Sequence, residues 1–276
     1  SFTLDVGGGG LTIPSMSNIG YTYLQADGNI IVTSATGNSS YSFYVNSDNG
    51  SVTLGSVTGV GSLNVDAETG ITIGSVTSTS SSFDAFNGNI VAAADNTGYE
   101  IDSGTGSVQV RAYQGSIGGA NGFDIRGGSI TLNAGGSGSV GSIGSAAKPV
   151  VINSTGSLSV DVANTFNIVG KDAGNTLQSF SSLTIDMRAG GIGTTSSIVA
   201  ANFPISDFVG NAFAPSSDGT TITLPDLTNH SLTSGLNLYI TDSTAGLGNV
   251  SLGQVESASG SFYLYAPGAV TQRSGK

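Results

Sequence analysis

Two neighbouring stretches, residues 50–69 and 70–89, carry the same order of apolar and polar positions. Each begins with a glycine and a short strand in which every second residue is apolar, and continues through a Gly-Ser-Val link and a Gly/Ser-rich turn into a second alternating strand. The apolar positions are Val52, Leu54, Leu63 and Val65 in the first stretch, and Ile71, Ile73, Phe83 and Ala85 in the second. A unit of about 20 residues that cannot bury its own apolar side predicts one coil of a solenoid.

The first strand of this unit recurs along most of the chain. It begins at Ile30, Val52, Ile71, Ile90, Val108, Ile130, Leu158 and Leu183, and second strands follow at Tyr41/Phe43, Leu63/Val65, Phe83/Ala85, Tyr99/Ile101, Phe123/Ile125, Val150/Ile152 and Phe166/Ile168. Because alternate residues of a strand share a face, we expect two inward apolar columns in parallel sheets. About twelve coils would form a rod roughly 55 to 60 Å long. A β-sandwich is the competing all-β architecture, but it does not require two columns that repeat in step.

The repeat pattern breaks within residues 196–236, which contain Pro204, Pro215, Pro225 and the single histidine. Proline removes a sheet hydrogen-bond donor, so we expect part of this segment to leave the coil. Alternating strands resume at residues 236–240, 250–252 and 262–266, which predicts one solenoid domain over residues 1–276. The excursion offers a candidate recognition patch made of Phe203, Asp207, Phe208, Phe213, Asp218, Asp226 and His230. The alternative is that its aromatic side chains pack onto the side of the rod.

The charge of the chain excludes one class of partner. The formal net charge is -11 and the chain has only seven Lys and Arg residues, so nucleic acid is an unsuitable ligand. The absence of cysteine excludes disulfides, thiolate metal sites and a cysteine nucleophile. No apolar run is long enough to span a bilayer as a helix. The chain begins without Met and in mid-pattern, so we expect it to be an interior piece of a longer protein.

Acidic residues on the second strands suggest a second candidate site. Alignment of these strands places Asn64, Asp84, Glu100 and Asp124 in one outward column, and Asp66, Phe86, Asp102 and Arg126 in the next. Carboxylates of Asp84, Glu100, Asp102 and Asp124 on successive coils could recruit a cation. The alternative is a solvated polar face, and we expect no cofactor and no dedicated metal site.

Residues 141–168 (GSIGSAAKPVVINSTGSLSVDVANTFNI) and 189–204 (AGGIGTTSSIVAANFP) share an Ile-Gly, a short polar stretch and an apolar strand. This phrase resembles the filamentous haemagglutinin-like adhesins, large bacterial exoproteins exported by two-partner secretion. The resemblance implies a right-handed parallel β-helix, a secreted or cell-surface location, and an outer-membrane secretion partner. It also implies a structural and adhesive role, in which the rod attaches to a glycan or protein on a host or neighbouring cell.

Parallel β-helices also include pectate-lyase-like enzymes, which are the alternative functional interpretation. Such enzymes use several acids around calcium together with a Lys or Arg base, whereas the bases of this chain are few and scattered. His230 lies in DLTNHS without a Gly-x-Ser-x-Gly sequence that would indicate a serine nucleophile. We therefore expect no catalytic activity.

Overall fold

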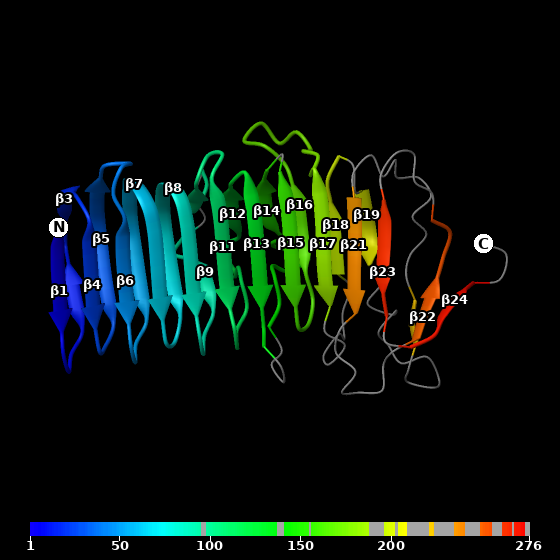
Figure 1. Ribbon diagram of the computed structural model, residues 1–276, viewed down its shortest axis with the longest axis horizontal. Coiled ribbons are helices and arrows are strands. Elements are labelled where there is room, and N and C mark those ends of the chain that lie inside the picture. Colours follow the sequence, from blue (N-terminus) through cyan, green and yellow to red (C-terminus); the bar gives the residue numbers. More distant parts are fainter. Residues whose placement is uncertain are drawn as a thin grey trace.

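The computed structural model describes residues 1–94, 98–136, 141–154, 156–187, 196–201, 204–208, 221–223, 235–240, 249–255, 261–266 and 268–273. These residues form strands and connections without any helix, and the strands stack into a rod with the N-terminus at one end (Figure 1). The strands nearest the viewer run downwards and those behind run upwards while the chain advances from left to right (Figure 1). The molecule is thus a right-handed parallel β-solenoid of about ten coils, which confirms the predicted fold class.

Each coil has three faces, one more than the two strands per coil that the sequence predicted. Face 1 is short and lies at the start of each coil. It comprises β2 (Leu11–Ile13), the first residues of β5 (Ile30–Gly37), β7 (Val52–Ala67) and β8 (Ile71–Ala85), and β9 (Ile90–Ala92). Further along, it continues as single bridges that join Ile90 to Ile117, Ile117 to Ile143 and Ile143 to Phe166.

Face 2 follows in each coil and was missed because its early strands lie within the Gly-Ser-Val links. Val57 and Val76 of these links are fully buried and pair with each other. The face consists of β3 (Met16–Ile19), the later part of β5, the middle of β7 and β8, β10 (Ile101–Asp102), β12 (Phe123–Arg126), β14 (Val150–Asn153), β16 (Asn167–Gly170) and β18 (Ser196–Val199).

Face 3 ends each coil and is the longest uninterrupted sheet. It consists of β1 (Phe2–Val6), β4 (Thr22–Ala26), β6 (Phe43–Ser47), the ends of β7 and β8, β11 (Ser107–Ala112), β13 (Ser129–Ala134), β15 (Ser157–Val162), β17 (Ser182–Met187), β21 (Gly235–Ile240) and β23 (Phe262–Tyr265). Eleven of the described strands therefore stack on this face.

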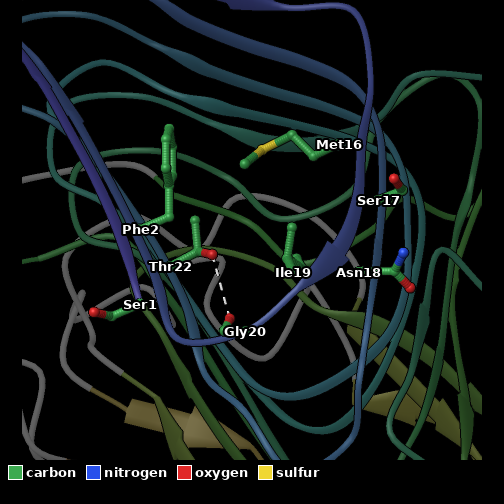
Figure 2. A pocket seen from close by; sticks show the side chains of 8 residues that line it. All are labelled: Ser1, Phe2, Met16, Ser17, Asn18, Ile19, Gly20 and Thr22. Atoms are coloured by element: carbon green, nitrogen blue, oxygen red, sulfur yellow. Dashed lines mark hydrogen bonds between the residues drawn. The ribbon is translucent and has the colours of Figure 1, made fainter.

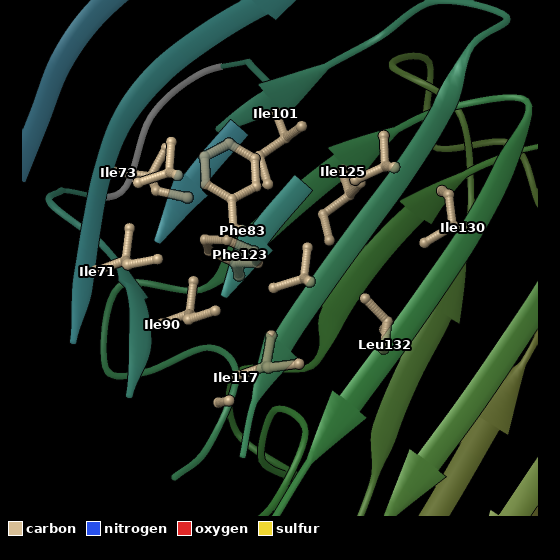
Figure 3. Packing of buried hydrophobic residues seen from close by; sticks show 14 of the residues in the cluster. Ile71, Ile73, Phe83, Ile90, Ile101, Ile117, Phe123, Ile125, Ile130 and Leu132 are labelled. Carbon is tan, nitrogen blue, oxygen red and sulfur yellow. The ribbon is translucent and has the colours of Figure 1, made fainter. Parts of the chain in front are cut away.

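The interior is filled by the alternating apolar residues that the sequence identified. Ile71, Ile73, Phe83, Ile90 and Phe123 point into a common core, and each is at most 1% exposed (Figure 3). This packing supplies the main stabilisation, because burying one such side chain contributes about 1.5–3 kcal/mol. The prediction that these alternating apolar residues point inward is therefore correct.

The predicted columns, however, exchange partners after Ala92. Val108 and Val110 were expected to follow Ile90 and Ala92, but they pair with Ser81 and Phe83 on face 3. Ile101 was expected to follow Ala85, but it pairs with Val76 on face 2. The reason is that a coil carries three strands, so a count of two per coil loses register where a connection lengthens.

The pairing of strands changes near residues 196–236, where the sequence predicted that part of the chain leaves the coil. β18 still pairs in parallel with β16, so the coil continues through Val199, whereas β19 (Pro204–Phe208) runs antiparallel to β18. The resumed strands lie where the sequence placed them, in β21, β23 and β22 (Asn249–Leu252). β22 lies between β20 (Thr221–Thr223) and β24 (Val270–Gln272) in a separate parallel sheet.

The first coil forms an open end. Among the described residues, β1 pairs only with β4, and β2 and β3 only with β5. Phe2, Met16 and Ile19 border a hollow of about 410 Å³ at this end, and Phe2 is 48% exposed (Figure 2). Apolar side chains that would be covered in a middle coil are therefore partly exposed here.

Candidate functional site

The predicted carboxylate ladder is not formed, because its members lie on different faces. Asp84 is on face 3, where it pairs with Asp66 and Arg111 and not with Glu100. Asp102 is on face 2 and pairs with Arg126, whose Nε donates to its Oδ1 at 2.6 Å.

The two other members of that ladder do not complete a cation site either. Glu100 is 2% exposed, and its Oε2 accepts a hydrogen bond of 2.5 Å from the Asp124 backbone N–H. Within the described ranges, no three acidic or histidine residues are grouped to hold a metal ion. The ladder prediction is wrong in its register, and the register error described above explains it.

Face 3 instead carries two continuous outward ladders, set by its parallel register. The first outward ladder is Tyr23, Tyr44, Asn64, Ser82, Gln109, Thr131, Ser159, Thr184, Asn237 and Tyr263. The second outward ladder is Gln25, Asn46, Asp66, Asp84, Arg111, Asn133, Asp161, Asp186, Tyr239 and Tyr265. Neighbouring members of a ladder are about 4.8 Å apart along the rod.

An ion pair joins β8 to β11 within the second outward ladder. The Arg111 guanidinium donates from Nη2 to Asp84 Oδ2 at 2.6 Å and from Nε to Oδ1, and Asp84 is 5% exposed. This hydrogen bonding raises the pKa of Arg111, because the carboxylate stabilises the charged guanidinium. Burial, and then repulsion by Asp84, raises the pKa of Asp66. The positive charge of Arg111 is thus already matched by a nearly buried carboxylate.

An aromatic platform lies beside this ion pair. The rings of Phe86 and Tyr113 stack with centroids 5.4 Å apart and planes 16° apart, and the Arg111 guanidinium lies 5.8 Å from the Tyr113 centroid. Burial is the main cause of the raised pKa of the Tyr113 hydroxyl. The hydroxyl therefore stays protonated at neutral pH and can donate a hydrogen bond.

A groove of about 500 Å³ runs across face 3 from this platform to Tyr239. Its floor is built of short side chains, because the first outward ladder contains the small residues Thr131, Ser159 and Thr184 between β11 and β21. We call this groove, from Tyr113 across β13, β15 and β17 to Tyr239, the face 3 trough. The side chains of these three residues are shorter than those at the two ends of the groove. The outward surface is therefore depressed here although the sheet continues without interruption.

Polar groups line the trough in a connected arrangement. Asn133 Nδ2 donates to Asp161 Oδ2 at 2.7 Å, and Asn237 Nδ2 donates to Thr184 Oγ1 at 3.3 Å. The Asn133 Oδ1 atom is buried and accepts no hydrogen bond from the described part of the chain. Asp161 and Asp186 are direct neighbours in the ladder, so hydrogen-bond acceptors dominate the middle of the trough.

Further aromatic side chains extend face 3 beyond both ends of the trough. Towards the N-terminus, the ring of Tyr44 lies 5.6 Å from that of Tyr21 and 6.4 Å from that of Tyr23. Towards the C-terminus, Tyr239 contacts Tyr263 at 5.5 Å and Tyr265 at 6.5 Å, and the latter two are about half exposed. Face 3 is thus an outward surface of tyrosine clusters separated by small polar residues.

The predicted recognition patch falls almost wholly outside the described residues. Phe203, Phe213, Asp218, Asp226 and His230 lie outside them. Asp207 and Phe208 belong to β19, of which only the backbone is described. This patch stays a prediction.

The sequence contains a pattern that marks the strands of face 3, and the prediction of two apolar columns does not use it. These strands end in an apolar residue, a polar residue and then a small residue, in the triplets 24–26, 45–47, 65–67, 83–85, 110–112 and 132–134. The small residues Ala67, Ala85, Ala112 and Ala134 stack in register. Alignment on this triplet would have placed Asp66, Asp84 and Arg111 in one ladder.

Comparisons with known proteins do not assign the chain to a group. No protein-family model, no curated protein and no solved structure matches it. Across the described ranges, no helix has the length and apolar character needed to cross a membrane.

Proposed function

We propose that this chain is a rigid adhesive segment of a large bacterial surface or secreted exoprotein, similar in role to the filamentous haemagglutinin-like adhesins. The observation that carries the proposal is face 3, a continuous outward surface on which tyrosine clusters alternate with amide, hydroxyl and carboxylate groups. Tyrosine is favoured at binding surfaces, because its ring contributes apolar contact area and its hydroxyl forms hydrogen bonds.

The shape of the molecule supports the same role. A solenoid in which each coil contacts only its neighbours forms an extended surface and holds it at a fixed spacing. The binding partner would be a glycan or protein on a host or neighbouring cell. Export through an outer-membrane secretion partner and a cell-surface or secreted location belong to the same proposal.

A direct binding assay tests this function. Beads coated with the chain should adhere to target cells, and the double variant Tyr263→Ser/Tyr265→Ser should adhere less while its unfolding temperature is unchanged. A second variant, in which residues 204–225 are replaced by a Gly/Ser turn, tests the predicted recognition patch separately. Adhesion no greater than that of uncoated beads, with every candidate cell type, would contradict the proposal.

The pectate-lyase-like enzyme is the second candidate and requires a different ligand. A polyuronide is an anionic polymer, and the only basic side chain lining the described trough is Arg111, which is paired with Asp84. Incubation with polygalacturonate, with and without calcium, should give no unsaturated product. Turnover would favour the enzyme over the adhesin.

A further inference from the structure

We propose that the face 3 trough is a binding subsite for an uncharged oligosaccharide that lies along the rod axis. This inference rests on the adhesive function proposed above, and it specifies both the chemical class of the ligand and the residues that contact it.

The shape of the trough selects an elongated ligand. It reaches from β11 to β21, which is four interstrand steps or about 19 Å along the rod. Tyr113, which stacks on Phe86, limits it at one end and Tyr239 limits it at the other, while Ser159 lies between them. A chain of several sugar rings fits such a depression, whereas a single small molecule would contact only part of it.

The chemistry of the trough matches a sugar chain. A pyranose ring has an apolar C–H face and a rim of hydroxyl groups, and tyrosine rings at both ends offer flat apolar contacts for such faces. Between them, Asp186 and the Oδ2 atom of Asp161, which already accepts from Asn133 Nδ2, can accept hydrogen bonds from sugar hydroxyls, and such bonds to a charged acceptor are stronger than neutral ones.

The charge of the trough distinguishes between kinds of glycan. Asp161 and Asp186 are direct neighbours, Asp66 and Asp84 lie further along the same ladder, and Arg111 is held by Asp84. A sulfated, sialylated or uronic acid chain would bring like charges together, which disfavours binding. The trough therefore suits an uncharged glycan.

A nucleic acid or an extended peptide strand fits the trough less well. The phosphates of a nucleic acid would be repelled by the acidic residues of the trough. A peptide strand would need a free sheet edge, whereas β13, β15 and β17 each pair on both sides. A cationic peptide could be attracted by charge alone and therefore serves as a comparison ligand in the test.

The test is calorimetric titration of the whole chain with four uncharged tetrasaccharides, namely those of β-linked glucose, α-linked glucose, β-linked N-acetylglucosamine and β-linked mannose. Tetragalacturonate and tetralysine are the charged comparisons. We expect at least one uncharged tetrasaccharide to bind and tetragalacturonate not to bind. Preferred binding of either charged ligand would overturn the proposal.

Two variants locate the binding to the trough. Ser159→Tyr fills its floor, and Tyr239→Ala removes one aromatic end; each should weaken tetrasaccharide binding about tenfold or more, the scale of one lost stacking contact. Thr72→Tyr is the matched control, because Thr72 is also an outward residue of a central strand but lies on face 1. Circular dichroism and the unfolding temperature should be the same for all four proteins.

The outcomes separate this inference from the proposed function. If cell adhesion persists while Ser159→Tyr and Tyr239→Ala bind tetrasaccharide like the parent chain, the trough assignment is wrong and the adhesive function stands. If a tetrasaccharide binds in the trough but coated beads do not adhere to any cell, the adhesive function is wrong and the trough assignment stands. If no uncharged tetrasaccharide binds, the inference fails whatever the adhesion result.

Discussion

The coils before Ala92 and those after Ile101 differ in how much chain they use. On face 3, register partners in the early coils are 20, 21, 20 and 18 residues apart, at Phe2/Thr22, Thr22/Phe43, Phe43/Leu63 and Leu63/Ser81. In the later coils they are 27, 22, 28 and 25 residues apart, at Phe83/Val110, Val110/Leu132, Leu132/Val160 and Val160/Ile185.

This difference lies outside the face 3 strands, in the corners and in face 1. In the early coils β7 and β8 run around all three faces as continuous strands of 16 and 15 residues, whereas face 1 of the later coils is reduced to single bridges. Inward residues nevertheless meet in both regions, and Phe83 and Phe123 are equally buried. The core therefore fixes the coil, while the length of a corner is free to vary because a longer loop costs little entropy.

Truncation of one core phenylalanine in each region tests whether the two regions have equally well-packed cores. Phe83→Ala in an early coil and Phe123→Ala in a later one should each cost about 3–5 kcal/mol, because both leave a cavity in a close-packed interior. The exposed Phe86→Ala is the matched control and should cost less than about 1 kcal/mol. Urea unfolding followed by circular dichroism measures all three, and a mild effect at Phe123 alone would show that the later core is looser.

The junction between the regions gives the second prediction. Arg111→Met removes the partner of Asp84 and leaves a carboxylate that is 5% exposed, at a cost of about 2–3 kcal/mol since Arg111 itself is partly exposed. Adding Asp84→Asn should restore most of this loss. A double-mutant cycle measures the coupling, and purely additive costs would show that the ion pair does not hold the junction.

The corners themselves give the third prediction. A Cβ on Gly88 would lie 1.2 Å from the Thr69 backbone oxygen of the previous coil, so Gly88→Ala should destabilise by about 1–3 kcal/mol. Gly98 lies in the longer corner with open space around it, so Gly98→Ala should be nearly neutral. Equal unfolding temperatures for the two variants would contradict the view that the corner at Gly88 is closely packed against the previous coil whereas the longer corner at Gly98 is open.

The smallest effect concerns pH in the early coils. Burial and the neighbouring Asp84 raise the pKa of Asp66 above its unfolded value of 3.8, although Arg111 partly opposes this. The folded state therefore binds the proton more tightly, and the contribution of Asp66 to stability declines as pH rises through this range. Asp66→Asn should match the parent near pH 3 and gain relative stability towards pH 7. Parallel curves from pH 3 to pH 7 would contradict this.

The sequence predicted the core well but the register only in part. Alternation at Val52, Leu54, Ile71 and Ile73 identifies inward residues because inside and outside differ in polarity. Polarity does not say which face a strand belongs to, so the sequence pattern places Ile101 beside Ala85, whereas its partner is Val76.

The candidate site could not be predicted because it depends on that register. Arg111 and Asp84 are 27 positions apart, and Asp161 and Tyr239 are 78 positions apart, yet each pair belongs to one ladder. Nothing in local composition marks such pairs. The trough exists only after several corners of unequal length have returned the strands to the same face.

The pairing of each coil with only its neighbours has a mechanical consequence. A pull along the rod axis loads the hydrogen bonds between strands one row after another, so coils would detach singly from an end such as β1, which pairs only with β4 among the described strands. A detached coil of about 20 residues extends to roughly 65–70 Å while the rod shortens by only about 4.8 Å. Under tension the molecule would therefore lengthen in steps and dissipate force while the remaining coils keep their shape.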